Sequence, residues 1–282
     1  MRKNNLSNDD ENDDCDVNGD NNCDTDDDDD EECDDDGDGA PTVLAHVELA
    51  QTVRECINLV TSHDIYLDTE QRLTPADFGA KIELPIFPEL IQRFLYDQLY
   101  PESHLTSSDV SLTACPVFLG VISLFSSATA SFYAPSDPSG IRGIRREQIR
   151  ATASWRGGPV QYDCAFVNTH PELAGLRGLD IVHILAFLSF TYHNKLYPCA
   201  LVRWYSVMGE DYDEDTGMWM VMPNIDNVSV IHIDTIFRAA HLLPVFSQSY
   251  LPRDITYHNS LDAFTTYYVN KFIDHHAFEI TV

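Results

Sequence analysis

The sequence predicts an α+β protein that is mainly β, a small barrel or sandwich of seven to eight short antiparallel strands with N-terminal helices and a C-terminal helix. Two observations support this fold class. From Thr113 onward, short runs rich in β-branched and aromatic residues alternate with turn-forming stretches such as APSDPSG and WRGGP. The longest of these runs, Ile181 to Ser206, has the pattern of two strands around the polar break His193-Asn194-Lys195.

Within this hairpin we expect Tyr192 to pair with Leu196 across a three-residue loop. This register places an almost wholly apolar set of residues on one face of the hairpin: Ile184, Ala186, Leu188 and Phe190 with Pro198, Ala200, Val202 and Trp204. The opposite face is mixed, as in a sheet with one side in a core and the other partly covered.

Composition divides the chain into three segments. Residues 1–40 contain 19 Asp or Glu against Arg2 and Lys3, about −17 of the formal charge of −29, and we expect them to be a disordered acidic tail. Residues 41–112 are predicted to be a helical segment, and residues 113–282 a β-rich, barrel-like domain. The body after the tail is also acidic, which disfavours non-specific adhesion to nucleic acid or anionic membranes.

In the first part of the body, apolar residues recur at three- and four-residue steps and predict an amphipathic helix over Val43 to Thr61. Ser62 to Phe87 is expected to be a loop with a turn of helix after Thr74, where the next residue is a proline that suits a first helical position. A second helix is expected to begin at Pro88 and to end before Pro101.

The β-rich part is predicted as a series of short elements around the hairpin. Four strands precede it: 117–125, 128–133, 148–153 and 160–167. After it we expect an acidic loop over Glu210–Thr216 and two strands, over Gly217–Met222 and Val228–Ile233. A short helix capped by Asp234 is expected over Asp234–Arg238. The segment from Ser260 is expected to be a last helix followed by a docked extended tail.

Several classes of protein are disfavoured by the sequence. The seven cysteines show no CxxC spacing, and the amino terminus is charged, so we expect free thiols in a reducing, intracellular compartment, nuclear or cytoplasmic. The most apolar run, Ile181 to Phe190, has ten residues and is too short to span a bilayer, so we expect no membrane partner. The sequence does not indicate an oligomeric state.

No motif of a catalytic or metal site stands out, so we expect neither enzyme activity nor a cofactor, with an unrecognised enzyme as the open alternative. The segment Asp14 to Asp20 imitates half a calcium loop, but Thr25 occupies the twelfth position, where a glutamate is needed. His275 and His276, beside Asp274, are expected to cap, pack or form hydrogen bonds rather than bind a metal.

The strongest candidate for a binding site is a run of arginines that ends beside an aromatic residue. Guanidinium groups next to an aromatic ring suit phosphate contact and base stacking. Strand alternation should turn Arg145 away from the others. The alternative is that the arginines pair with acids such as Glu147, Asp163 or those of the loop 210–215 and stabilise the surface of the sheet. The candidate nucleic-acid-binding residues are Arg142, Arg146, Arg150, Arg156 and Trp155.

Several long motifs carry a family resemblance over roughly Pro85 to Val282. They are SGIRGIRREQIRATASWRGGPVQYDCAFVNT, GLRGLDIVHILAFLSFTYHNKLYPCALVRWYS, DEDTGMWMV, VIHIDTIFRAAHLLPVF and YYVNKFIDHHAFEI. The chain resembles the C-terminal region of transposon-encoded, CACTA-like or Plavaka-type transposase-related proteins of mushroom-forming fungi. The resemblance implies a non-catalytic accessory domain, because the metal-binding core of such transposases lies upstream and needs more chain. The alternatives are a truncated metal-dependent transposase or nuclease fragment and a protein with no selected activity.

The order of strands and acidic loop also resembles small barrels that read chromatin. Such barrels hold a methylated cation in an aromatic cage, and the residues that could form one here are Tyr197, Trp204, Tyr205 and Trp219. The alternative is that the tryptophans are core residues of adjoining strands. The partners that the resemblance implies are therefore nucleic acid or a chromatin protein.

Overall fold

The computed structural model describes residues 45–49, 72–136, 142–246, 253, 255–256 and 259–282. The acidic tail expected over residues 1–40, with its calcium-like segment, lies outside these ranges. So does most of the helix expected over Val43 to Thr61. All statements below concern the described residues.

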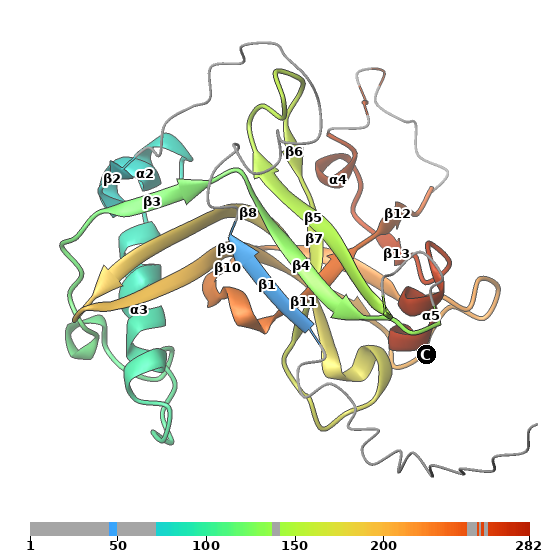
Figure 1. Cartoon of the computed structure of the whole chain (residues 1–282), viewed down its shortest axis with the longest axis horizontal. Helices are drawn as coiled ribbons and strands as arrows, with labels where there is room; N and C mark the ends of the chain where they lie inside the picture. The colour runs from blue at the N-terminus through green and yellow to red at the C-terminus, as the bar shows by residue number, and fades with distance from the viewer. Residues whose placement is uncertain (1–44, 50–71, 137–141, 247–252, 254, 257–258) are drawn as a thin grey trace, which may run out of the picture. The chain divides into compact units, whose positions relative to one another are not determined.

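Antiparallel strands form two sheets (Figure 1). The smaller sheet has the order β1 (Ala45–Leu49), β4 (Ser127–Tyr133), β5 (Ile144–Thr152) and β6 (Gln161–Tyr162). The larger sheet has the order β11 (Ile236–Ala240), β7 (Cys164–Asn168), β8 (Leu179–Tyr192), β9 (Lys195–Met208), β10 (Met220–His232), β13 (Tyr267–Val269) and β12 (Leu242–Pro244). Strand β3 (Ile122–Phe125) also pairs with β8, and β2 (Arg72–Leu73) pairs with β3.

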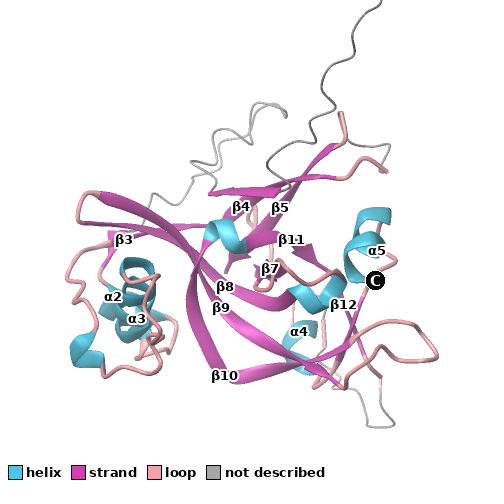
Figure 2. Ribbon diagram, turned by 90° about the horizontal axis from the view of Figure 1, so that it is seen from below, coloured by secondary structure: helices cyan, strands magenta, loops and turns pink. Residues whose placement is uncertain are grey.

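The mainly β prediction is confirmed, with a curled antiparallel sheet, whereas the number of strands and the placement of the helices differ from the prediction. Thirteen strands occur in the described part of the chain instead of seven or eight. The long strands β8, β9 and β10 curl into a half-barrel (Figure 2). None of the described helices is long and apolar enough to cross a membrane.

The helices are short and lie at the two ends of the chain's described part. They are α2 (Pro75–Lys81), α3 (Phe87–Leu99), α4 (Ser260–Ala263) and α5 (His275–Thr281), with single 3₁₀ turns at η1 (Leu112–Ala114), η2 (Gly175–Gly178) and η3 (Ile233–Thr235). The Thr74 hydroxyl accepts a hydrogen bond from the Asp77 N–H at 3.2 Å, which caps α2 where a turn of helix was predicted. The helix predicted from Pro88 is confirmed as α3.

The helix predicted over Val43 to Thr61 is wrong at residues 45–49. This segment is strand β1, which pairs with β4 from Ala45↔Phe132 to Leu49↔Ala128, and its Val47 is buried. Pairing with a strand about eighty residues further along overrides the local helical spacing. The expected helical segment 41–112 therefore contributes strands as well as helices.

The long hairpin forms as predicted, but its register is shifted. Tyr192 pairs with Lys195, so the turn has two residues, His193 and Asn194, both with positive φ (48° and 62°). Further along, an irregularity between Ile184 and Ala186 leaves Leu185 without an opposite residue, because Ile184 pairs with Val202 and Ala186 with Leu201.

Three apolar cores result. The first lies between the small sheet and strands β7 to β9, and it includes Val47, Phe132, Ile149, Ile184 and Val202. The second lies under α2 and α3, and it includes Phe87, Ile91, Phe190, Tyr197 and Leu201. The third is completed from the C-terminal segment, and it includes Phe166, Ile181, Tyr205, Val221 and Tyr267.

Three further elements differ from the prediction. One bent strand, β10, replaces the two strands expected over 217–222 and 228–233, and its irregularity lies between Pro223 and Val228. The short helix expected after Asp234 is instead the turn η3 followed by strand β11. The extended tail expected at the carboxyl end is strand β13 and then helix α5.

Candidate functional site

The predicted arginine row lies along β5, and the predicted alternation is observed. Ile149 is fully buried, and Arg145 and Glu147 share its side of the strand, where Arg145 lies 3.7 Å from the Asp274 carboxylate. Arg146 points to the other side and is exposed. The strand thus separates a partly buried arginine beside Asp274 from one that faces solvent.

Arg150, on the same side as Arg146, is held by an acid. Its Nε and Nη2 donate to the two oxygens of Asp163 at 2.8 Å each, and its backbone N–H donates to the same carboxylate at 2.8 Å. The hydrogen bonds from Arg150 to Asp163 raise the pKa of the guanidinium. At this position the alternative of pairing with Asp163 holds, because the Nε–Nη2 edge of the guanidinium already binds a carboxylate bidentately.

The other members of the row lie in the turns at the two ends of β5. Arg142 precedes the strand with φ 54°, and Arg156 follows it with φ 51°. The guanidinium of Arg156 lies 5.4 Å from the ring centroid of Trp155. Arg142, Arg146 and Arg156 are exposed, and none makes an ion pair with another described residue. Of the five predicted residues, the structure leaves these three arginines and the half-buried Trp155 accessible.

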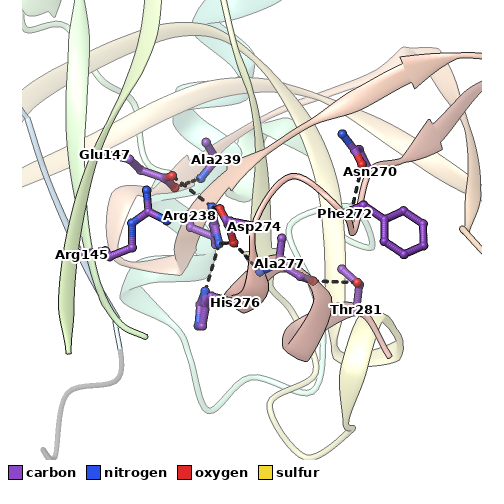
Figure 3. Close-up of polar contacts among 10 residues, drawn as sticks. All are labelled: Arg145, Glu147, Arg238, Ala239, Asn270, Phe272, Asp274, His276, Ala277 and Thr281. Atoms are coloured by element: carbon purple, nitrogen blue, oxygen red, sulfur yellow. Dashed lines mark hydrogen bonds and ion pairs between the residues drawn. The ribbon is translucent and has the colours of Figure 1, made fainter. Parts of the chain in front are cut away.

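A buried ion-pair network, which the sequence did not reveal, lies beneath this row (Figure 3). Arg238 of β11 is 1% exposed, and its guanidinium lies 4.5 Å above the ring of Phe132. It donates to Asp274 at 2.9 and 2.7 Å and to Glu147 at 3.3 Å. It also contacts His276 Nδ1 at 3.1 Å. The network therefore ties strands β5 and β11 to the start of helix α5.

The protonation states in this network follow from burial and from Arg238. Burial alone would raise the pKa of Asp274, but hydrogen bonds from Arg238 and from the Ala277 N–H outweigh it and lower the pKa to about 2. Burial, with help from the Arg238 charge, lowers the pKa of His276, so its Nδ1 accepts from the guanidinium. Burial raises the pKa of Glu147 against the opposing effect of Arg238.

These contacts assign a structural role to the segment that follows β13. Asp274 caps α5 by accepting the Ala277 N–H at 2.7 Å, and His276 stacks on Phe132 with ring centroids 4.8 Å apart. His275 lies 3.2 Å from Glu279 on the exposed side. The interpretation of the two histidines as capping, packing or hydrogen-bonding residues is confirmed.

An open cleft of about 350 Å³ lies between the edge of β5 and the β11–β12 segment. Its lining includes Glu147, the Arg150–Asp163 pair, Cys164 and His241. Burial raises the pKa of the Cys164 thiol to about 12, so this cysteine is not an activated nucleophile. No group of three or more His, Cys, Asp or Glu within the described ranges is arranged to hold a metal ion.

The four residues considered for an aromatic cage do not come together. Tyr197 is 2% exposed in the core under α3, and Tyr205 packs against Tyr267 in the third core. Trp204 packs on the first core, with its Nε1 donating to Ser229 Oγ at 2.7 Å. Trp219 packs on the third core. Trp204 and Trp219 therefore pack against the cores of the fold, as in the alternative to an aromatic cage.

The fold and these surfaces define a mainly β, antiparallel domain with a row of exposed arginines above a buried ion-pair network. Comparisons with family models, with curated proteins and with solved structures found no match to this chain.

Proposed function

We propose that the body of this chain is a non-catalytic binding domain that contacts nucleic acid through Arg142, Arg146 and Arg156, with Trp155 as a stacking platform. One observation supports this proposal above the others. These three guanidinium groups are exposed and unpaired among the described residues, whereas Arg150 and Arg238 are paired with carboxylates. Exposed guanidinium groups without a carboxylate partner are able to bind phosphate bidentately.

The spacing of the three arginines fits a linear ligand. Strand β5 has nine residues and is therefore about 30 Å long, so the turns that hold Arg142 and Arg156 lie about that far apart. A single nucleic-acid strand can extend over such a row, with bases stacking on Trp155 at one end. The contact is expected to be weak, because the body around the row is acidic.

The test is the salt dependence of binding. Three phosphate contacts predict that the logarithm of the affinity of the full chain for a fluorescein-labelled single-stranded DNA falls with the logarithm of salt concentration with a slope of about −2. Replacing Arg146 and Arg156 with Ala should reduce the slope to about −0.7. The matched control is Arg177→Ala, since the Arg177 side chain is 70% exposed on another part of the fold.

The proposal fails if the chain shows no salt-dependent binding at low ionic strength, or if the double variant keeps the slope of the unmodified protein. Equal losses for Arg177→Ala and for the row variants would also contradict it, because they would indicate non-specific attraction. In its wider setting we propose an accessory domain of a fungal transposon-derived protein that acts near chromatin, in the nucleus. The resemblance of the motifs supports that setting.

A further inference from the structure

A second exposed surface carries the opposite electrostatic character. The ammonium group of Lys271 lies 5.8 Å from the ring of Tyr212, 5.4 Å from that of Phe272 and 5.2 Å from that of Phe278. Tyr212 comes from the loop between β9 and β10, and the two phenylalanines come from the segment around the start of α5. We call Tyr212, Lys271, Phe272, Phe278 and the acidic residues of loop 210–215 the acidic aromatic surface.

The rings of this surface are unusually accessible for aromatic residues. Tyr212 is 56% exposed, Phe272 62% and Phe278 42%, and the two phenylalanine rings lie 6.2 Å apart. Tyr212 packs edge-on against Trp219, with the ring centroids 6.4 Å apart, and Trp219 in turn packs on the third core. Tyr212 is therefore connected to the third core through Trp219, and part of each of the three rings remains open to a partner.

The loop beside the rings has an excess of negative charge. Five of its six residues are acids, and the sixth is Tyr212. Asp213 fixes the turn by accepting from Thr216 N and Oγ1 at 2.9 and 2.7 Å, and Asp211 lies 3.8 Å from Arg177. The remaining acids, Glu210, Glu214 and Asp215, are exposed and make no ion pair with described residues.

We propose that the acidic aromatic surface binds a lysine- or arginine-rich segment of a partner protein. Its carboxylates would pair with cationic side chains, and its ring faces would take an ammonium or guanidinium group, as they already take Lys271. In this proposal the ammonium group of Lys271 occupies the ring faces while no ligand is bound, and a cationic side chain of the bound peptide displaces it. Nucleic acid and anionic lipid are repelled by the same loop, so the complementary partner is a basic peptide.

This surface shares no residue with the arginine row, so the two proposals can fail separately. The probe is a short peptide of alternating lysine and alanine that carries a fluorophore and a benzophenone cross-linker, mixed with the full chain at low salt. Because the acidic residues at 1–40 also attract such a peptide, the cross-linked positions are identified by mass spectrometry. Cross-links to loop 210–217 or to residues 270–278 support the proposal, and cross-links confined to residues 1–40 overturn it.

Two variants test the contacts. Glu214→Gln with Asp215→Asn should weaken peptide binding about threefold or more at low salt, whereas Glu102→Gln with Asp226→Asn removes the same charge from exposed positions elsewhere and should have a smaller effect. Phe272→Ala should reduce cross-linking at this surface, with an unchanged melting temperature as evidence that the fold is intact.

Lys271→Ala distinguishes a ligand stand-in from a structural lysine. If the peptide displaces Lys271, removing the lysine frees the ring faces and should tighten binding about two- to fivefold. Weaker or unchanged binding by a folded Lys271→Ala protein would overturn the displacement. Equal effects of the loop variant and its charge-matched control would overturn the site itself.

Discussion

Replacing Arg238 with Met tests how strongly the buried network fastens α5 to the sheets. Met keeps an apolar stem over Phe132 but removes the charge that two carboxylates share. Glu147 and Asp274 have side chains only 17% exposed, so both would lose their main partner in a poorly solvated place. Breaking a buried pair in this way costs about 3 kcal/mol of unfolding free energy. We therefore expect the melting temperature to fall by roughly 6 to 12 °C.

Calorimetry or circular dichroism at pH 7 measures the change, with Arg146→Met on the exposed side of β5 as the matched control. The control should change the unfolding free energy by less than about 0.5 kcal/mol. A second measurement follows stability against pH. Because the pKa of Asp274 is about 2 in the folded protein and 3.8 without its partners, stability should decrease as the pH falls from about 4 toward 2.

Arg238→Met should flatten that acidic part of the profile, since Asp274 then loses its main cation and keeps only the Ala277 N–H and the more distant Arg145 to lower its pKa. Adding Asp274→Asn to Arg238→Met should recover part of the lost stability, because a neutral amide leaves one buried charge fewer and still caps α5. The reasoning is refuted if Arg238→Met is as stable as Arg146→Met, or if its acid profile matches that of the unmodified protein.

Three further predictions concern other parts of the chain. Burial holds the pKa of His276 below 6.5, so stability should decrease as the pH falls below 6.5, and His276→Phe should lessen this loss, measured by urea unfolding across pH 5 to 7. Removing residues 1–40, which carry about −17, should strengthen binding to single-stranded DNA, and equal affinities would argue against competition between the tail and phosphate. The purified protein should show no magnesium- or manganese-dependent cleavage of DNA, and an activity abolished by mutating one aspartate of the body would contradict the non-catalytic proposal.

Local signals predicted the elements that depend on local interactions. A threonine cap followed by proline marked the start of α2, and Pro88 marked the start of α3. Strand alternation along β5 was enough to separate Arg145 from Arg146. Each of these features is determined within a few residues of the chain, where propensity, capping and period act directly.

The buried network could not be predicted in this way, because its members are distant in sequence. Arg238 lies 91 residues from Glu147 and 36 from Asp274, and its strand was expected to be a short helix. The composition of IFRAA gives no sign that the arginine faces inward, since a buried arginine is recognisable only with its carboxylates in view. The arginine row had the same difficulty at Arg150, where pairing with Asp163 depends on how β5 meets the next strands.

The bulge at Leu185 explains why the predicted apolar face of the hairpin was only partly right. A strand has a period of two, so one extra residue moves every later side chain to the opposite face. Before the bulge, Ile184 and Val202 share the first core, as predicted, whereas beyond it Phe190 faces the second core with Tyr197 rather than with Pro198. Because both faces of β8 are apolar here, the sequence offers no contrast that would locate the extra residue. The same apolarity allows one continuous strand to serve two cores, one under the small sheet and one under α3.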